Sequence, residues 1–189
     1  MNIGVSKSHL LWSLCGLALA FAPHTTRFDL GLTACFTVLV LWRLLGAYGY
    51  LPLPTRAHRT LWVLKQALAL IAFLVIYVSY RGQIGRDAGI ALLTALLGLK
   101  VLELERERDY YVVSFLSYFL VVTNFFYTQS IVTALYMLAV VVVITAGLVR
   151  FNTAREQFTD FECLRLAAIL SAEALPLMVV AFLLFPRLP

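Results

Sequence analysis

Seven runs of mostly apolar residues, separated by short turns, constrain this chain more than any other feature of its sequence. They cover residues 10–22, 30–45, 61–80, 88–102, 110–126, 131–149 and 164–185. A helix rises 1.5 Å per residue, so about 20 residues cross the hydrocarbon core of a bilayer. The third, sixth and seventh runs reach that length. The first, second, fourth and fifth runs are shorter, so their polar flanks must extend towards the interface or the bilayer must become thinner around them. We therefore predict an all-α fold, a polytopic membrane bundle of about seven transmembrane helices.

The composition supports a membrane environment. Of 189 residues, 62% are hydrophobic and 13% are charged, whereas soluble domains contain about 45–50% apolar and about 25% charged residues. A soluble core of this size has too little interior to hide so much apolar surface. No low-complexity linker divides the chain, so we predict that residues 1–189 form a single membrane domain. The first run ends in Ala-Phe-Ala, like a signal peptide, but Pro23 follows directly and favours a retained helix.

The distribution of basic residues predicts the orientation. With the N-terminus in the cytoplasm, only four of the 15 Lys and Arg residues fall on the outer side, namely Arg27, Arg81, Arg86 and Arg187. Short cytoplasmic loops are enriched in Lys and Arg. We therefore expect a multi-pass protein of the bacterial inner membrane with the N-terminus cytoplasmic and the C-terminus periplasmic. Because the basic residues flank apolar runs, the net charge of +5 does not indicate nucleic-acid binding.

Several kinds of chemistry have no motif in this sequence. GxSxG, HExxH and P-loop patterns are absent. Two of the three cysteines lie in apolar runs and one lies in a predicted polar loop, and we expect all three to be small buried hydrophobes: Cys15, Cys35 and Cys163. The histidines are predicted to lie in separate loops: His9, His24 and His58. We therefore predict no catalytic, cofactor-binding or metal site within the chain.

The densest polar segment closes the fourth apolar run. Lys100 and Glu103 are three residues apart, so they share a helix face and are expected to pair, with Glu107 extending that face. Arg108 and Asp109 complete the segment. One interpretation is a helical hairpin held by ion pairs at the membrane surface. The other is a site that handles protons or ions, since ionisable groups within membranes are commonly functional.

Polar residues also mark the predicted outer turns. Asp87 is placed to cap the fourth helix, and Arg86 beside it is free to meet lipid headgroups or a partner domain. Asn124, Gln129 and Ser130 surround the next outer turn. We expect turn-forming and capping roles for these three, with Ser130 capping the sixth helix.

Glu173 is the acid placed deepest in an apolar run. An isolated carboxylate there is unfavourable, so we expect it to be protonated, paired or exposed to a wet cavity. Pro176 follows three residues later and is expected to kink the helix. Interhelical hydrogen bonding and a transport role are both compatible with this pattern.

Four strings, taken in order, resemble a known family. They are GRDAG at 85–89, LKVLEL at 99–104 followed by Arg108 and Asp109, FYTQS at 126–130, and ALPLM at 174–178 continuing to LFPRLP at 184–189. In this order and spacing the chain resembles the N-terminal membrane domain of bacterial TgpA-type transglutaminase-like proteins. Two positions depart from the pattern, because Asn124 stands where His is expected and Glu173 where Gln is expected.

The resemblance implies a larger parent protein. In that family a periplasmic transglutaminase-like domain with a Cys-His-Asp triad follows the membrane domain, and it is associated with acyl transfer from glutamine side chains or with the corresponding hydrolysis. Such a domain is expected after Pro189 and is absent from this chain. The expected partners are the lipid bilayer and that periplasmic domain, in cis or encoded nearby. A homo-oligomer is left open as a further partner. No cofactor is implied.

Two functional hypotheses follow. In the first, the chain is the membrane anchor and scaffold of a transglutaminase-like enzyme of the cell envelope, and outward-facing Arg86 and Arg187 contact the catalytic domain. In the second, it is a small stand-alone transporter or lipid-handling protein. Its path would be lined by Glu173, Lys100 and Glu103, with Pro176 as the hinge.

Overall fold

The computed structural model describes residues 7–53, 59–80, 85–153 and 158–184, and all of its regular structure is helical. One short 3-10 helix, η1 (Ala22–Thr26), follows the first of seven α-helices. The α-helices are α1 (Lys7–Phe21), α2 (Leu30–Ala47), α3 (Arg59–Ser79), α4 (Arg86–Val101), α5 (Glu107–Asn124), α6 (Ile131–Asn152) and α7 (Asp160–Leu184). Each of the seven predicted segments coincides with one of these helices, which confirms the all-α class.

Helix caps explain where the observed boundaries differ from the predicted ones. Helix α7 begins four residues before its apolar run, because Thr159 and Glu162 form reciprocal side chain–backbone bonds of 2.6 and 3.3 Å. Helix α5 likewise begins early, since the Asp109 carboxylate accepts a 3.1 Å bond from the Arg106 amide. The predicted cap of α6 is confirmed, because Ser130 Oγ accepts from the Thr133 amide at 3.1 Å.

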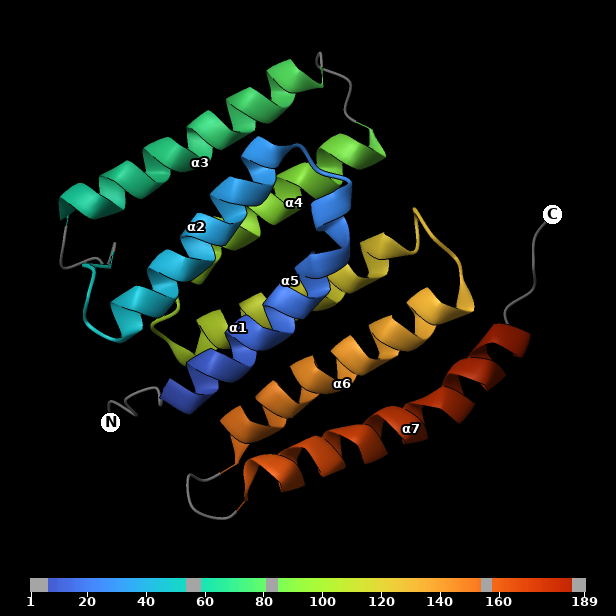
Figure 1. The fold of residues 1–189 in the computed structure, drawn as a ribbon. Helices are drawn as coiled ribbons and strands as arrows, with labels where there is room; N and C mark the ends of the chain where they lie inside the picture. The colour runs from blue at the N-terminus through green and yellow to red at the C-terminus, as the bar shows by residue number, and fades with distance from the viewer. Residues whose placement is uncertain (1–6, 54–58, 81–84, 154–157, 185–189) are drawn as a thin grey trace.

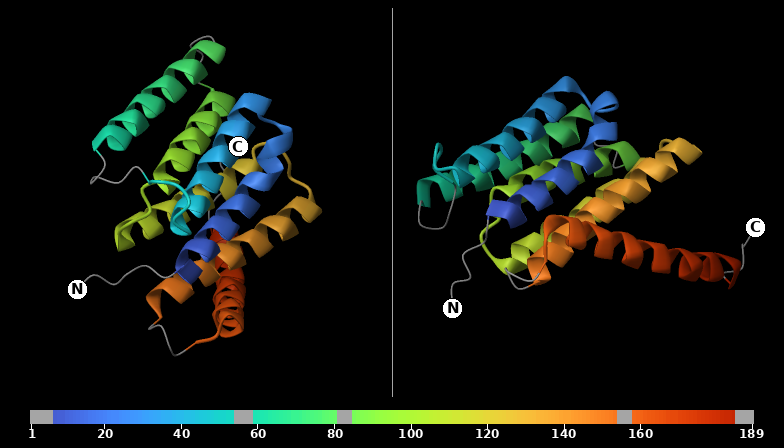
Figure 2. Two further views of the ribbon diagram at one scale, coloured as in Figure 1. Left: turned by 60° about the vertical axis from the view of Figure 1, so that its left-hand side comes forward. Right: turned by 60° about the horizontal axis from the view of Figure 1, so that its bottom comes forward.

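Successive helices run in opposite directions, so their ends form two opposite faces of the bundle (Figure 1). Helix α1 packs against α5 and α6, whereas α4 packs against α2, α3 and α5. Helix α7 lies at the edge and packs on α6, and its C-terminal part diverges from the rest of the bundle (Figure 2). The first residues of α3, α5 and α7 therefore lie at the same end as the start of α1.

The core and the outer surface are both apolar. Fully buried Leu17, Leu97, Val113 and Leu120 join α1, α4 and α5. Large apolar side chains also cover the outward faces of α2, α3 and α7, as expected where lipid rather than water is the solvent. Among the described residues, three helices are long and apolar enough to cross a membrane, namely α2, α6 and residues 160–180 of α7, and residues 63–79 of α3 form a shorter apolar helix.

Cysteine and histidine positions correct part of the sequence-based prediction. Cys163 lies buried inside α7 rather than in a polar loop, because the Thr159 cap starts that helix early. Cys15 and Cys35 are exposed on α1 and α2 instead of buried, since an apolar environment outside the bundle makes burial unnecessary. His9 is buried within α1 rather than in a loop. His58 lies outside the described residues.

Two glycines allow helices to approach closely. A Cβ at Gly98 would lie 3.1 Å from side-chain atoms of Phe36 and Leu39, so α2 sits tightly on α4 there. A Cβ at Gly16 would lie 2.9 Å from Ile144 Cγ1, which places α1 against α6. By contrast, Gly89 has no atom within 4 Å of such a Cβ. Small residues are a common means of close packing between membrane helices.

Substituting Ala is expected to change stability in opposite directions at Gly16, where the helices are in close contact, and at Gly89, where there is open space. Gly16→Ala is expected to lower the free energy of unfolding by about 1 kcal/mol, because its methyl group overpacks the contact with Ile144. Gly89→Ala is expected to raise it by up to about 1 kcal/mol, since Ala favours a helix over Gly. Unfolding both variants in mixed detergent micelles measures the difference. Equal stabilities would contradict the close approach of α1 to α6.

Candidate functional site

Polar side chains, several of them buried, gather in two clusters at opposite ends of the bundle. The first, which we name the Lys100 cluster, consists of Lys65, Lys100, Glu103 and Asp109. Lys100 Nζ lies 3.1 Å from Glu103 Oε2 and 2.7 Å from Asp109 Oδ1. Glu103 also pairs with Lys65 of α3. The predicted pairing of Lys100 with Glu103 is therefore confirmed, and two additional charges complete the cluster.

The Lys100 cluster fastens several helices together. Lys65 and Asp109 are buried, so their charges require the partners they have. Beside the cluster, Arg43 of α2 donates from Nη2 to the Leu104 carbonyl at 2.6 Å. The ends of α2, α3, α4 and α5 thus meet at one turn. This geometry agrees with the predicted hairpin held by ion pairs.

Two neighbours of this cluster lie apart from it. Residues 102–105 form a turn rather than a continued helix, so the expected helical face extending to Glu107 is not present. Glu107 and Arg108 are exposed in the first turn of α5. In the described part of the chain, the Arg108 side chain makes no hydrogen bond or ion pair.

The second cluster, which we name the Tyr127 cluster, consists of His24, Arg27, Arg86, Asp87, Asn124, Tyr127 and Thr128. The guanidinium groups of Arg27 and Arg86 each lie 4.6 Å from the centre of the Tyr127 ring, an arrangement that favours cation–π attraction. The Tyr127 hydroxyl donates to Asp87 Oδ1 at 2.7 Å. Burial and this acceptor raise the pKa of Tyr127 to about 12, so the hydroxyl remains a donor at neutral pH.

Arg27 joins η1 to the end of α5. Its Nη1 donates to Asn124 Oδ1, and its Nη2 donates to Thr128 Oγ1 at 2.8 Å. Asn124 is completely buried and donates in turn to Met137 Sδ at 3.6 Å. The turn-forming role predicted for Asn124 is therefore incomplete, because its main contact is a long-range one with Arg27.

Arg86 and Asp87 differ from their predicted roles. Helix α4 begins at Arg86 with Gly85 in the capping position, so Asp87 lies in the first turn and does not cap the helix. Its carboxylate is turned towards Tyr127 instead. Arg86 donates to the Phe126 carbonyl at 2.9 Å and to Asp87 at 3.3 Å while remaining half exposed. Both side chains thus hold the turn after α5 against α4.

His24 is fully buried beneath the Tyr127 cluster. Its Nε2 lies 3.1 Å from the Leu120 carbonyl, which requires that nitrogen to carry the proton, and Nδ1 has no hydrogen-bond partner among the residues the structure describes. Burial lowers the pKa of His24, the Leu120 bond opposes this shift, and nearby Arg27 adds to it. The neutral imidazole is therefore the form that fits the fold.

This position predicts a pH-dependent stability. Because the folded pKa of His24 is depressed, the unfolded chain takes up a proton first as the pH falls below about 6.5. The free energy of unfolding therefore keeps its full value at neutral pH and falls progressively towards pH 5. The Tm of the wild type is expected to fall more steeply between pH 7.5 and 5 than that of His24→Asn. Parallel Tm curves for the two proteins would contradict a neutral buried His24.

The remaining predicted residues that the structure describes belong to neither cluster. Gln129 is exposed in the turn before α6. Glu173 is exposed on α7 and makes no hydrogen bond or ion pair with the residues the structure describes, and Pro176 lies inside the same helix. Arg187 lies outside the described residues. No hydrogen bond or ion pair of the described residues joins Glu173 to Lys100 or Glu103, the residues expected to line a transport path together.

Sequence comparisons supply a family context. Residues 12–189 match the model of the TgpA N-terminal domain. A protein-glutamine gamma-glutamyltransferase from Pseudomonas aeruginosa is 34% identical over 184 residues, which cover 97% of this chain and 27% of the relative. The chain thus spans about a quarter of the length of that curated relative. No solved structure matches the chain.

Proposed function

Because this chain belongs to the TgpA N-terminal domain family, we propose that it is the membrane anchor and scaffold of a transglutaminase-like enzyme of the cell envelope. The observation that carries the proposal is the extent of the match. Nearly the whole chain aligns with 27% of a relative whose printed activity is glutamyl transfer. The catalytic groups of such a parent enzyme would then lie in a separate domain, in cis or encoded nearby, and residues 1–189 alone would not be an enzyme.

The fold supports this role. Four helices meet at the Lys100 cluster, and η1, α4, α5 and α6 meet at the Tyr127 cluster, so polar contacts, several of them buried, join the helices at both ends of the bundle. A bundle of this kind would hold an attached domain at the membrane surface. Tethering raises the effective concentration of an enzyme near substrates on the same surface. No nucleic acid or cofactor enters this mechanism.

The proposed orientation places the N-terminus in the cytoplasm and the C-terminus in the periplasm. Lys7, Lys65 and Lys100 lie at the end of the bundle where α1 begins, whereas Arg27 and Arg86 lie at the opposite end. The bias of Lys and Arg towards cytoplasmic loops supports this arrangement. The chain would then be a multi-pass protein of the bacterial inner membrane, with the Tyr127 cluster facing the periplasm and available to the catalytic domain or to a second copy.

The native gene product tests the anchor proposal. We expect the reading frame past Pro189, or an adjacent one, to encode a domain with Cys, His and Asp in triad order. An immunoblot of the inner-membrane fraction with an antibody against residues 1–189 is expected to show either a band well above 21.2 kDa or, for a split gene, co-purification with that domain. A 21.2 kDa product with no such domain encoded nearby would contradict the proposal.

A further inference from the structure

An apolar groove runs between α2 and α3. Both helices pack on α4, which forms the floor of the groove with Ala91 and Ala95. The left view of Figure 2 shows α4 between the other two helices. The groove has a volume of about 550 Å³, within the range of about 300–1,000 Å³ typical of small-molecule sites. It is open on the side where α2 and α3 present their exposed apolar surfaces.

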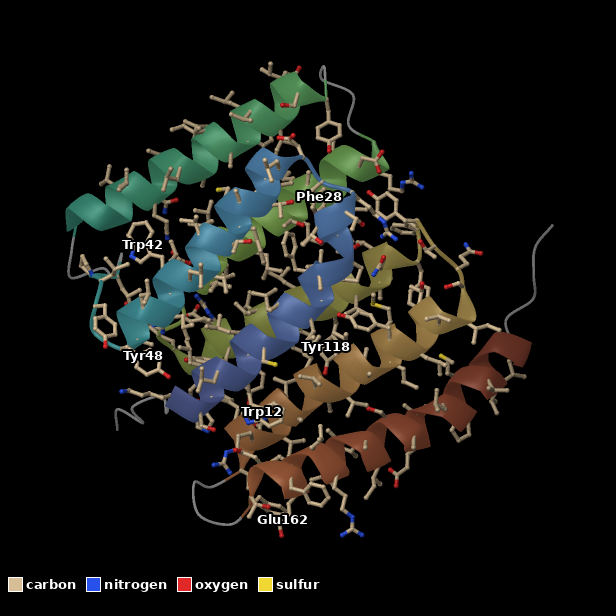
Figure 3. The ribbon with its side chains drawn as sticks, viewed as in Figure 1. Trp12, Phe28, Trp42, Tyr48, Tyr118 and Glu162 are labelled. Carbon is tan, nitrogen blue, oxygen red and sulfur yellow. The ribbon has the colours of Figure 1, made fainter. Side chains whose placement is uncertain are left out.

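The two ends of the groove differ in chemistry. Near Trp42 it is closed by apolar packing of Leu39, Leu68, Leu99 and Trp42, and the Trp42 indole already donates to the Pro52 carbonyl at 3.0 Å. The opposite end is lined by polar Asp29, Ser79 and Tyr80. Figure 3 labels Trp42 at the closed end and Phe28, the residue before Asp29, towards the polar end. A ligand in this groove therefore has its polar group beside Asp29.

The length of the groove fits a chain of one membrane leaflet. Its lining on α2 extends from Gly31 to Trp42, a separation of eleven positions or about 17 Å at 1.5 Å per residue. This length is close to half of the hydrocarbon core, which is about 30 Å thick. An acyl chain with its headgroup at the polar end would therefore extend along α2 to the closed end beside Trp42.

The charge at the polar end favours a cationic headgroup. Asp29 is exposed, and one of its oxygens accepts the 3.1 Å capping bond from the Gly31 amide. In the described part of the chain no Lys or Arg pairs with Asp29. The carboxylates of Asp29 and Asp87 both lie near Tyr80 at this end of the groove. A phosphate alone would be repelled here, whereas an ammonium group complements Asp29.

We propose that this groove binds one phospholipid with an ammonium-bearing headgroup, its acyl chain lying between α2 and α3 and its amine beside Asp29. The lipid would fill the space between two helices that are joined through α4, and would hold α3 against the bundle. This role goes beyond anchoring and does not depend on the identity of any attached enzyme.

Native mass spectrometry of the purified chain, titrated with phosphatidylethanolamine or phosphatidylglycerol, tests the proposal. One molecule of phosphatidylethanolamine is expected to bind. At the same lipid concentration, the fraction of protein that carries phosphatidylglycerol is expected to be at least fivefold lower. Cys35→Trp fills the groove from an exposed position and is expected to weaken binding at least tenfold, as is Val38→Trp. Cys15→Trp is the matched control, because Cys15 is exposed on α1 and does not line the groove.

A second substitution tests the headgroup. Asp29→Asn keeps the helix cap, since Asn caps helices as well as Asp, but removes the charge. It is expected to reduce the preference for phosphatidylethanolamine over phosphatidylglycerol at least fivefold. The proposal is overturned if both groove variants retain lipid like the Cys15→Trp control, or if Asp29→Asn leaves the headgroup preference unchanged. A wild-type dimer that Cys35→Trp converts to a monomer also overturns it, because a second copy would then occupy the groove.

Discussion

Replacing Asp109 by Asn is expected to lower the free energy of unfolding by about 3 kcal/mol. Asp109 is 6% exposed and accepts a 2.7 Å bond from Lys100 and a 3.1 Å bond from the Arg106 amide. The Asn side chain can still cap α5, but it no longer balances the charge of Lys100. Because Lys100 keeps Glu103 as a second partner, the effect is expected at the lower end of the range for broken buried pairs.

The matched control for Asp109→Asn is Glu105→Gln. Glu105 is exposed in the turn between α4 and α5, and its side chain makes no hydrogen bond or ion pair with the described residues. Unfolding in mixed micelles should therefore show a change within about 0.5 kcal/mol for Glu105→Gln. If both variants were equally stable, the Lys100 cluster would have no part in joining α4 to α5.

Replacing Arg27 by Met is expected to destabilise the opposite end of the bundle by about 3 kcal/mol. The change removes two hydrogen bonds from a charged donor, each worth about 1.5 kcal/mol or more. It also removes one cation–π contact and leaves buried Asn124 without its donor. The stability of Arg27→Lys is expected to lie between those of the wild type and Arg27→Met, since an ammonium group cannot reproduce the paired donors of the guanidinium.

Arg86→Met provides the comparison for Arg27→Met. Both arginines lie 4.6 Å from the Tyr127 ring, so the two substitutions remove the same ring contact. Arg86 is half exposed, however, and its acceptors Phe126 and Asp87 lie near solvent. Its loss is therefore expected to lower the free energy of unfolding by only about 1 kcal/mol. Equal losses for the two arginines would show that the bonds to Asn124 and Thr128 do not stabilise the fold.

The helices were predictable because a bilayer permits few alternatives to them. Seven apolar runs predicted seven helices, and Ser130 was recognisable as a cap from its position before an apolar run. The early starts of α5 and α7 were missed, since their first turns are polar and are held by Asp109 and Glu162 rather than by apolar periodicity. The packing partners of each helix depend on contacts such as Gly16 with Ile144, which no local pattern reveals.

The polar clusters were predictable only where their members are close in sequence. Lys100 and Glu103 are three residues apart, so their pairing could be predicted from the spacing, although Glu103 lies in the turn after α4 and not on the helix itself. Lys65 and Asp109 join them through the tertiary fold. Arg27 lies about a hundred positions from its acceptors, so the Tyr127 cluster had no spacing signal. The FYTQS string marked Tyr127 as part of a resemblance without indicating that two arginines flank its ring.

Reporter fusions after Pro189 test the central claim most directly, since an anchor must present its attached domain outside the cytoplasm. The account predicts that alkaline phosphatase fused there is active in cells and that green fluorescent protein fused there is dark. For fusions after Thr153, between α6 and α7, we expect inactive alkaline phosphatase and fluorescent green fluorescent protein. Fluorescence after Pro189, with inactive phosphatase, would place the C-terminus in the cytoplasm and contradict the proposed role as the anchor of a periplasmic enzyme.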